Sequence, residues 1–321
     1  MGEFDLIARY FTRPARRNPL GVGDDCALLR PAPGMQLAVS TDMLVEGRHF
    51  LSTVDPRSLG HKALAVNLSD LAACGAQPLA FTLSLALPQV DEAWLAGFAD
   101  GLFALADAHD CELVGGDTTR GPLTINITVF GEVPAGQALL RSGARAGDDI
   151  WVSGTLGDAR LALEAFRGTV SLPEHVFAAA RERMDRPQPR VALGLALRGI
   201  ANAAIDVSDG LLGDLGHVLQ QSRAGATIHL GCAQHLLAAA RAGFQLDPAR
   251  LEELVFAGGD DYELAFTATA RHRAAVESAA ARAQVPLTRI GHVDAQAGLR
   301  LLDAQGHPVA RRFGGFDHFR P

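Results

Sequence analysis

Aspartate residues recur at the ends of apolar segments in this sequence. Five of them follow strand-like runs: Asp42 after LAVST, Asp117 after ELVGG, Asp206 after NAAI, and Asp260 and Asp261 after LVFAGG. Strand ends in α/β sheets open into the crevice where ligands bind. Carboxylates that converge there are suited to Mg²⁺, which takes hard oxygen ligands and keeps some phosphate oxygens and waters in its shell. The pattern therefore favours a magnesium site built from strand-end acids.

Three further acids lie in other settings. Asp24 and Asp25 lie in the glycine turn LGVGDDCA, and because Asp is also a common turn former, both roles stay open for them. Asp70 lies within the apolar helix candidate KALAVNLSDLAACG. A carboxylate in such a setting is costly unless it is paired or bound to a metal, which favours a functional role for Asp70.

Capping and turn formation compete with metal binding at the remaining positions. Asp209 is also suited to cap the helix that follows it, and Asp206 to form a turn with Ser208. Asp148 and Asp149 lie in a turn before a strand, where a structural role is favoured. Residue type alone therefore leaves two interpretations for Asp206 and Asp209.

The elements that must position these acids alternate between strands and helices. Apolar runs, caps and breakers predict strands at 37–40, 81–87, 112–114, 124–133, 150–153 and 262–269, and helices at 56–73, 92–108, 159–166 and 271–283. Asp91 is expected to cap the second of these helices. The segment 203–222 is typical of a strand, a turn and a helix. Both halves mix the two element types, which predicts a two-domain α/β or α+β chain.

The expected boundaries decide where the acids lie. We expect the first strand to end at Thr41 and Asp42, and the glycine-rich segment GGDTTRGP to form a turn after the third strand. The segment 134–149, rich in Gly, Pro and Arg, is the expected linker. The corresponding domains are residues 1–137 and 138–321.

Composition excludes several classes of function. The chain has 321 residues, of which 48% are hydrophobic and 20% charged, so it can bury a sizeable core and is not a disordered protein. Lysine and arginine number 29 against 36 aspartates and glutamates, a net charge of −7, and no long basic run occurs. Binding to nucleic acid or to an anionic membrane is therefore not expected.

Familiar nucleotide and hydrolase motifs do not occur in the sequence. Lys62 is the only lysine and lies in Gly-His-Lys-Ala, which excludes a P-loop. The segment GVGDDC lacks the third glycine of a dinucleotide fingerprint, and no His-Glu-x-x-His, Gly-x-Ser-x-Gly or His-Arg-Asp motif is present. The segment SGTLGDARL has the form of a phosphate-binding nest, although a tight turn is the commoner explanation.

Cysteine usage and the N-terminal residues indicate a compartment. Cys26, Cys74, Cys111 and Cys232 are far apart and form no Cys-x-x-Cys pair, which favours a reducing environment over a disulfide framework. The first residues, MGEFDLIARYF, contain no cationic leader, and no apolar run reaches the roughly 18 residues that a membrane span needs. We therefore expect a cytoplasmic protein.

Nine segments form an ordered set from about residue 3 to about residue 319. They are GVGDDCA, AVSTDMLVEGRHF, KALAVNLSDLAACGAQP, LVGGDTTRGP, LRSGARAGD, VSGTLGD, AIDVSDGLLGDLGH, GGDDYELAFT and GGFDHF. Together they resemble the thiamine-monophosphate kinase family over nearly the whole chain. This family shares a superfamily with aminoimidazole ribonucleotide synthetase, selenophosphate synthetase and a hydrogenase-maturation protein. All of these bind ATP without a P-loop, in agreement with the context of Lys62.

The resemblance implies a two-domain α/β (α+β) fold of the aminoimidazole ribonucleotide synthetase type. Residues 1–137 would bind ATP and Mg²⁺ and would pair with their copy in a second subunit as a β-barrel, giving a homodimer. Residues 138–321 would form an α+β domain that completes the cleft. The implied reaction transfers the γ-phosphoryl group of ATP to thiamine monophosphate, with several Mg²⁺ ions, and gives thiamine diphosphate and ADP.

The resemblance also assigns roles by position. Eight residues match the family's magnesium-binding positions: Asp25, Ser40, Thr41, Asp42, Asp70, Asp117, Asp206 and Asp209. Four match its ATP contacts: Gly116, Asp117, Arg141 and Ser208. Three match the thiamine-monophosphate pocket: His49, Asp260 and Phe316. No catalytic side chain is implied beyond those that position metal and ATP, of which Asp42, Asp117 and Arg141 are the most critical.

Some of these roles have alternatives or depart from the family pattern. Asp260 stands where the family commonly has Glu in Gly-Gly-Glu-Asp-Tyr-Glu, so its shorter arm would need a water to reach the substrate. His109 stands where relatives often carry Tyr against the nucleotide, and a histidine at a helix end explains it equally. Phe316 suits stacking on a cationic heterocycle or a place in the core. Arg141 suits a phosphate chain, although surface arginines are usually solvated.

The chemistry of the acceptor agrees with an acid-rich site that lacks a nucleophile. A phosphate monoester has a second pKa of about 6 and is largely a dianion at neutral pH, so no strong base is needed. The difficulty is to bring two anions together, which metal ions solve by neutralising and aligning them.

The alternatives are another ATP-dependent phosphoryl-transfer enzyme of the superfamily or a non-catalytic relative. Selenophosphate synthetases use a reactive Cys in a glycine-rich loop and the maturation protein a C-terminal Cys. Here Cys26 follows GDD without a neighbouring Lys and the chain ends in DHFRP.

Overall fold

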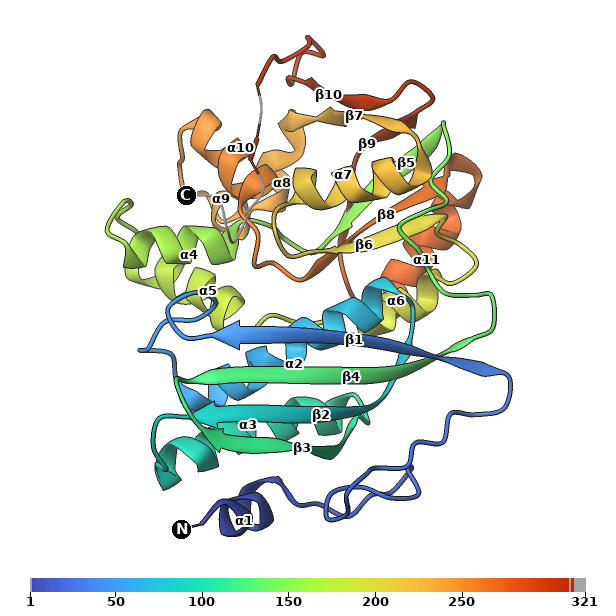
Figure 1. Cartoon of the computed structure of the whole chain (residues 1–321). Coiled ribbons are helices and arrows are strands. Elements are labelled where there is room, and N and C mark those ends of the chain that lie inside the picture. The colour runs from blue at the N-terminus through green and yellow to red at the C-terminus, as the bar shows by residue number, and fades with distance from the viewer. Residues whose placement is uncertain (1, 312, 315–321) are drawn as a thin grey trace. The chain divides into compact units, whose positions relative to one another are not determined.

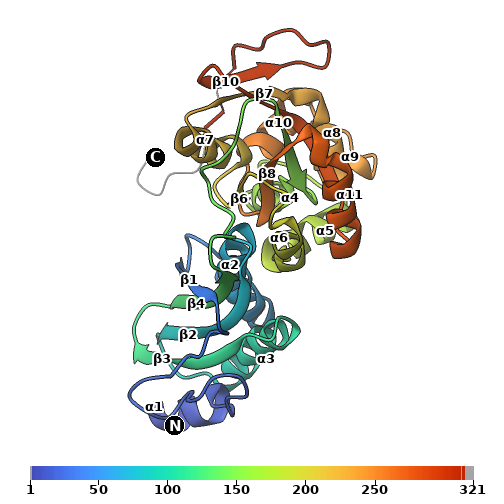
Figure 2. The same cartoon turned by 90° about the vertical axis from the view of Figure 1, so that its right-hand side faces the viewer.

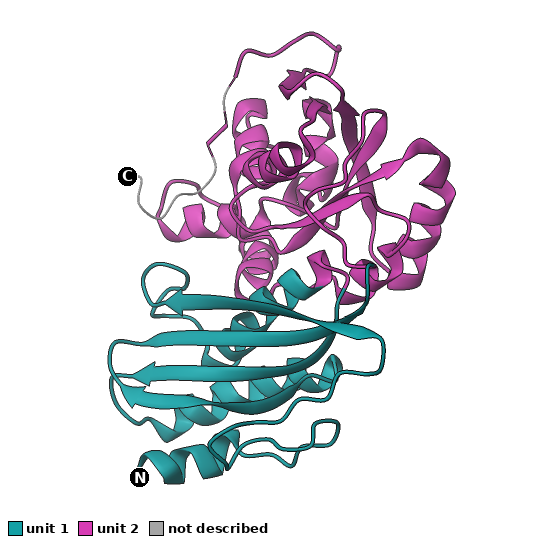
Figure 3. Ribbon diagram, turned by 45° about the vertical axis from the view of Figure 1, so that its right-hand side comes forward, with its two compact units in different colours: residues 1–71, 76–136 teal, residues 72–75, 137–321 magenta. Residues whose placement is uncertain are grey.

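The computed structural model describes residues 2–311 and 313–314 of the chain. Two compact units divide it: unit 1 comprises residues 1–71 and 76–136, and unit 2 comprises residues 72–75 and 137–321 (Figure 3). Each unit combines helices with one sheet, so the expectation of a two-domain mixed α/β chain is confirmed. Among the described residues neither sheet closes on itself, and no helix is long and apolar enough to cross a membrane.

Unit 1 is built on a four-stranded sheet with the order β1-β4-β2-β3. Its strands are β1 (Met35–Val45), β2 (Gln77–Leu87), β3 (Glu112–Arg120) and β4 (Thr124–Pro134). Its helices are α1 (Glu3–Leu6), the π-helical turn η1 (Ile7–Phe11), α2 (Pro56–Ala73) and α3 (Glu92–Ala108). The pairs β1–β4 and β4–β2 are antiparallel. The pair β2–β3 is parallel because α3 returns the chain to the end of the sheet at which β2 begins.

Helices α2 and α3 cover one face of this sheet (Figures 1 and 2). They approach each other closely at glycines: a Cβ on Gly60 would lie 2.0 Å from the carbonyl oxygen of Phe98, and one on Gly101 would lie 1.8 Å from that of Arg57. The covered face carries the buried core of unit 1, including Leu83 on β2. Small residues at the crossing therefore allow two helices to pack side by side on a narrow sheet.

Among the described residues of unit 1, no helix covers the opposite face of the sheet (Figure 2). Along β1 the alternate residues Leu37, Val39 and Met43 are 44%, 58% and 56% exposed. Successive side chains of a strand point to opposite faces, so these three residues share one face. We call this surface, defined by Leu37, Val39 and Met43, the open face.

Unit 2 is built on a six-stranded sheet with the order β10-β7-β9-β5-β8-β6. Its strands are β5 (Asp148–Ser153), β6 (Ala203–Val207), β7 (Gly225–His229), β8 (Glu263–Thr269), β9 (Leu287–Asp294) and β10 (Gly298–Leu302). Its α-helices are α4 (Asp158–Phe166), α5 (Glu174–Asp185), α6 (Val191–Leu197), α7 (Leu211–Ser222), α8 (Ala233–Leu236), α9 (Ala238–Arg241), α10 (Pro248–Ala257) and α11 (Arg273–Ala283), with 3₁₀ turns η2 (Leu230–Cys232) and η3 (Ala270–His272). The β10–β7 pair is parallel and the other pairs are antiparallel.

A buried ion cluster joins the sheet of unit 2 to two of its helical segments. Glu263, at the start of β8, is fully buried and accepts hydrogen bonds from Arg183 of α5 at 2.6 Å and from Arg190, the residue before α6. Ser153 at the end of β5 donates to the same carboxylate at 2.5 Å. Two arginines and a hydroxyl compensate the buried charge, as a buried carboxylate requires.

Three expected boundaries are wrong, and each changes where an acid lies. The first strand continues past Thr41 and Asp42 to Val45, the segment GGDTTR is part of β3 instead of a turn, and β5 begins at Asp148 instead of after Asp149. Asp42, Asp117, Asp148 and Asp149 therefore lie inside strands. In contrast, the helix at 92–108 is confirmed with Asp91 as its cap, which accepts the N–H groups of Ala93 and Trp94.

Candidate functional site

Ser40, Asp42 and Asp70 form the first group of expected metal ligands. Ser40 and Asp42 alternate on β1 on the face that α2 covers, and Ser40 Oγ donates to Asp70 Oδ2 on α2 at 2.5 Å. The N–H of Asp42 donates to Oδ1 of Asn67, one turn before Asp70 on the same helix, at 3.1 Å. The apolar helix that carries Asp70 is thus fixed against the strand that carries Asp42. Asn67 takes part in this arrangement without having been expected from the sequence.

Thr41 lies between Ser40 and Asp42 but its side chain is on the open face. Its Oγ1 donates to the carbonyl oxygen of Ile127 at 3.1 Å and accepts from Asn126 Nδ2 at 3.2 Å, both on β4. Thr128 Oγ1 lies 3.0 Å from the same hydroxyl. The alternation of a strand therefore separates the Thr41 side chain from those of Ser40 and Asp42.

Gly116 and Asp117 lie on β3, at the edge of the sheet opposite to β1. The register pairs Asp117 with Ser84 and Ser84 with Asn126, whose side chain contacts Thr41, so Asp117 is on the open face. Gly116 has φ +149°, and a Cβ there would lie 1.8 Å from the carbonyl oxygen of Leu83. Three strand spacings separate β1 from β3 by about 14 Å. Within one chain, Asp117 and Asp42 therefore lie on opposite faces of the sheet and on strands at its opposite edges.

Asp25 lies in an exposed loop between two short bridged segments. Leu20 and Leu28 are bridged, with the N–H of Leu28 donating to the carbonyl oxygen of Leu20 at 3.0 Å. Asp24 Oδ1 accepts the N–H of Asp25 at 2.9 Å, so Asp24 acts as a turn former as one interpretation of the sequence had it. Asp25 is exposed at the tip of this acidic loop, which we define as residues 20–28.

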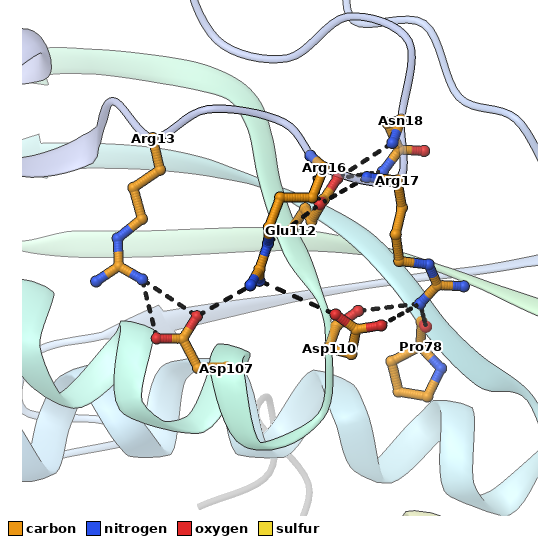
Figure 4. Close-up of polar contacts among 8 residues, drawn as sticks. All are labelled: Arg13, Arg16, Arg17, Asn18, Pro78, Asp107, Asp110 and Glu112. Carbon is orange, nitrogen blue, oxygen red and sulfur yellow. Dashed lines mark hydrogen bonds and ion pairs between the residues drawn. The ribbon is translucent and has the colours of Figure 1, made fainter.

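Two buried glutamates hold the chain on either side of the acidic loop. Glu112, the first residue of β3, accepts the N–H groups of Arg16 at 2.8 Å and Arg17 at 2.9 Å, and the Nδ2 of Asn18 at 2.9 Å (Figure 4). Glu132 on β4 accepts the N–H of Ala32 at 2.8 Å. The acidic loop is therefore held before and after its tip by one end of the sheet.

Backbone donors set the charge state of Glu112. Burial pushes the pKa of its carboxyl group upward, but hydrogen bonds from the N–H groups of Arg17, Arg16 and Asn18 and from the Asn18 side chain outweigh burial. The pKa is held below its usual value, so Glu112 is an anion at neutral pH. Its strongest partners are main-chain groups, and the arginine side chains beside it lie outward against Asp107 and Asp110 (Figure 4).

In unit 2 two turns bring together Ser208, Asp209 and Asp260. The turn that joins β6 to α7 contains Ser208 and Asp209, and the segment GGDDY carries Asp260. The N–H of Asp260 donates to the carbonyl oxygen of Ser208 at 2.7 Å, and that of Tyr262 donates to Val207 at 2.9 Å. Residues expected to contact ATP, metal and substrate thus share one hydrogen-bonded backbone frame.

Asp214 belongs to the same frame and was not expected from the sequence. Its Oδ2 accepts the N–H groups of Ser208 at 3.0 Å and Asp209 at 3.1 Å. Burial, opposed in part by these hydrogen bonds, raises the pKa of Asp214 to about 7. The available sequence signal is an acid on an apolar helix face between Leu211, three residues before it, and Val218, four residues after it, both buried.

The remaining residues of this unit lie around the same turn. Asp206 lies in β6 and is buried, next to the turn. Gly210, not Asp209, is the N-cap residue of α7, so the capping interpretation of Asp209 is wrong. Arg141 is exposed. Its charge opposes, in part, the burial that raises the pKa of Asp214, and its carbonyl oxygen accepts from Ser222 Oγ at 3.2 Å.

The residues expected to bind thiamine monophosphate are distributed over both units. His49 is in unit 1, half-buried, and its Nδ1 accepts the N–H of Val45 at 3.0 Å, which leaves the ring proton on Nε2. Asp260 is in unit 2, and Phe316 lies outside the described residues. His109 is the C-cap residue of α3, where burial, and then His61, lower its pKa.

In unit 1, Ser40, Asp42 and Asp70 form one group, while Asp25 lies in the acidic loop and Asp117 on the open face. In unit 2, Asp206 and Asp209 form a second group at the turn after β6. Among residues 2–311 and 313–314, no three His, Cys, Asp or Glu side chains lie together in an arrangement that holds a metal ion. Hard oxygen donors dominate each group, which fits Mg²⁺ by ligand type.

Comparison with known proteins shows which families this chain is similar to. Residues 23–133 match the model of the AIR synthase related protein N-terminal domain, and residues 145–303 match that of its C-terminal domain. The chain is 46% identical to thiamine-monophosphate kinase of Escherichia coli K12, over 99% of this chain and 98% of the relative.

Solved structures give the same result. The crystal structure of thiamine-monophosphate kinase from Stenotrophomonas maltophilia K279a has a TM-score of 0.83 and 46% identity, covering 93% of this chain and 94% of that one. AaThiL complexed with AMPPCP and TMP has a TM-score of 0.75 and 30% identity, covering 90% and 89%. The chain therefore belongs to the thiamine-monophosphate kinase family, among the AIR synthase related proteins.

Proposed function

We propose that this chain transfers the γ-phosphoryl group of ATP to thiamine monophosphate and releases thiamine diphosphate and ADP. The observation that carries the proposal is identity of 46% over essentially the whole length of both proteins to a thiamine-monophosphate kinase. A solved relative bound to AMPPCP and TMP supports a nucleotide together with a phosphate-bearing second ligand. ATP as co-substrate supports the cytoplasm as the place of action.

The reaction needs positioning and charge neutralisation more than a catalytic base. The acceptor phosphate is largely a dianion at neutral pH and attacks the γ-phosphorus as it stands. Bound Mg²⁺ supplies charge neutralisation and alignment of the two phosphate groups. By ligand type, Asp42 and Asp70 with Ser40 fit one metal site, and Asp25, Asp117, Asp206 and Asp209 fit others. Thr41 is proposed with them because it matches the family pattern. Together these eight residues are the proposed metal set.

The remaining proposed residues bind the two substrates. Gly116, Ser208 and Arg141 are proposed to contact the nucleotide, Gly116 through its main chain and Arg141 through the phosphates of ATP. His49, through the Nε2 proton, and Asp260 are proposed to hold thiamine monophosphate, with Phe316 as the third member of that pocket. These groups orient the reactants, and orientation is a large part of catalysis in phosphoryl transfer.

We further propose that the active enzyme is a homodimer in which two N-terminal sheets form a β-barrel. Within one chain, Asp42 and Asp117 lie on opposite faces and opposite edges of a four-stranded sheet, about 14 Å apart. The open face is apolar along β1, where Leu37, Val39 and Met43 are exposed. A second copy would cover the apolar face, remove the strand edges and bring the Asp117 of one subunit toward the Asp42 of the other.

Two experiments test the proposals. Purified protein is incubated with ATP, Mg²⁺ and thiamine monophosphate, and thiamine diphosphate is measured; turnover of a different acceptor but not of this one would refute the assigned substrate.

For the dimer, Asp42→Asn and Asp117→Asn proteins, each inactive alone, are mixed and allowed to exchange subunits. A site shared between subunits restores about a quarter of wild-type activity, because half of the dimers are mixed and half of their sites are intact. No recovery, with exchange verified, would refute the shared site.

A further inference from the structure

Asp214 lies in the first turn of α7 and bonds backwards to the turn before the helix. Its Oδ2 accepts two main-chain N–H groups, those of Ser208 and Asp209, at 3.0 and 3.1 Å. The residue is only 4% exposed. A buried carboxylate is expensive in free energy, and an apolar side chain would fill the same space at lower cost. The two hydrogen bonds are therefore the feature that distinguishes Asp from an apolar residue at this position.

The turn that Asp214 holds has no capping side chain of its own. The N-cap residue of α7 is Gly210, with φ 115° and ψ 135°, a conformation that side chains other than glycine rarely adopt. A capping side chain accepts N–H groups inside the helix and not those before it, so the N–H groups of Ser208 and Asp209 need a different acceptor. Asp214 supplies that acceptor from one turn inside the helix.

The peptide of Ser208 is also held from the other side. Its carbonyl oxygen accepts the N–H of Asp260 at 2.7 Å, and a Cβ on Gly259 would lie 2.6 Å from the same oxygen. Asp214 therefore fixes the N–H end of the segment whose C=O end is fixed by the GGDDY turn. Displacement of either contact moves the backbone from which the Ser208 and Asp209 side chains extend.

We infer that Asp214 is a positioning residue of the phosphoryl-transfer site, whose carboxylate orients Ser208 for the nucleotide and Asp209 for the metal. The inference rests on the proposed function, since the roles of Ser208 and Asp209 belong to that proposal. Asp214 acts only through these two peptides. Loss of a partner that orients metal-binding groups lowers metal affinity or activity by about 10- to 100-fold.

The variant Asp214→Leu places two methyl groups where the carboxylate oxygens lie, so the N–H groups of Ser208 and Asp209 lose their acceptor. We expect amide exchange at residues 208 and 209 to become at least about tenfold faster, and affinity for AMPPCP with Mg²⁺ to fall about 10- to 100-fold. In steady state, kcat falls together with a rise in the KM for ATP, and the KM for thiamine monophosphate changes less. Asp214→Asn keeps an amide oxygen that can accept both N–H groups, as Oδ2 does, and is expected to retain more nucleotide affinity than Asp214→Leu.

Asp149→Asn is the matched control for loss of a buried carboxylate in the same unit. Asp149 is 5% exposed and accepts from Arg273 at 2.6 Å and from Arg289 at 3.3 Å, neither of which belongs to the proposed site. This variant is expected to lower thermal stability without changing AMPPCP affinity or exchange at residues 208 and 209. An equal loss of nucleotide affinity in both variants would show general destabilisation and overturn the inference.

The outcomes separate the inference from the proposed function. Asp214→Leu protein with wild-type exchange at residues 208 and 209 and wild-type AMPPCP affinity overturns the positioning role. Wild-type protein that binds AMPPCP with Mg²⁺ but makes no product from thiamine monophosphate refutes the acceptor, while the comparison of AMPPCP affinities still decides the role of Asp214. Wild-type protein that does not bind AMPPCP refutes both.

Discussion

The substitution Glu112→Gln tests whether one buried carboxylate docks the N-terminal segment that leads to the acidic loop. Glu112 accepts four hydrogen bonds, two on each oxygen, from the N–H groups of Arg16, Arg17 and Asn18 and from the Asn18 side chain. A glutamine has one acceptor oxygen, so it retains at most two of the four. Its NH₂ group then faces the two donors that have lost their acceptor.

The magnitude follows from the bonds that are lost. Hydrogen bonds to a charged group contribute roughly 1.5 kcal/mol or more each, so two of them amount to about 3 kcal/mol. This free energy corresponds to about a 100-fold increase in the population of the opened segment. Amide hydrogen exchange at residues 16–18 measures that population directly, whereas global unfolding of a two-unit chain does not follow a single transition.

Glu92→Gln is the control for this experiment. Glu92 forms an ion pair with Arg9 at 2.8 Å that also links the N-terminal segment to α3, but both side chains are more than half exposed. Exposed pairs contribute between about 0 and 1 kcal/mol, so exchange at residues 16–18 should change less than about fivefold in this variant. The reasoning fails if Glu112→Gln behaves like Glu92→Gln.

The pH dependence gives a second readout of the same contact. Because the pKa of Glu112 is lower in the folded protein than in the unfolded chain, its stabilising contribution is present above the unfolded value, about 4.3 for Glu, and is lost as the pH falls through the folded value. Protection of residues 16–18, after correction for intrinsic exchange, should therefore stay constant from neutral pH to about pH 5 and decrease below it. Glu112→Gln protein should lack this decrease.

Three further substitutions test other parts of the structure. Gly116→Ala places a Cβ 1.8 Å from the carbonyl oxygen of Leu83 and should destabilise unit 1 by at least about 2 kcal/mol, measured by amide exchange of the β3 residues that pair with β2; unchanged exchange would refute the close approach. Asp260→Glu restores the longer arm common in the family and should lower the KM for thiamine monophosphate by about tenfold, and an unchanged KM would argue against a contact. Asp91→Ala removes the cap of α3 and should cost about 1 kcal/mol, measured by amide exchange in the first turn of α3, with Asp100→Ala at an exposed position inside the helix as the control.

Local signals predicted α2, α3, α4, α7 and α11 to within about two residues of their ends, but they did not predict α5, α6 or α10. The helix at 92–108 begins after a capping Asp91, and the helix at 56–73 ends before Gly75, which has φ +65°. The strand, turn and helix of segment 203–222 are also confirmed, as β6, a turn and α7. In each case the signal lies within a few residues of the boundary that it predicts, so a single sequence contains it.

Strand boundaries and the arrangement of the acids could not be predicted in this way. The segment GGDTTR has the glycines and polar residues of a turn, but it pairs with β2 through main-chain hydrogen bonds that do not depend on side-chain type. The separation of Asp42 from Asp117 depends on the strand order and on alternation within strands. Both are set by pairing between segments that are distant in the sequence. No local signal could therefore show that the acids do not converge at strand ends.

Several buried acids of this chain hold loops through main-chain hydrogen bonds. Besides Glu112 and Asp214, three accept N–H groups from loops: Glu132 from Ala32, Asp148 from Arg145 and Asp261 from Gly157. A buried carboxylate must be compensated, and N–H groups of loops can do so where a cation is not available. Each such bond also fixes a loop conformation. The same residue type therefore provides the proposed metal ligands and the contacts that orient the segments carrying them, and only the second kind requires burial.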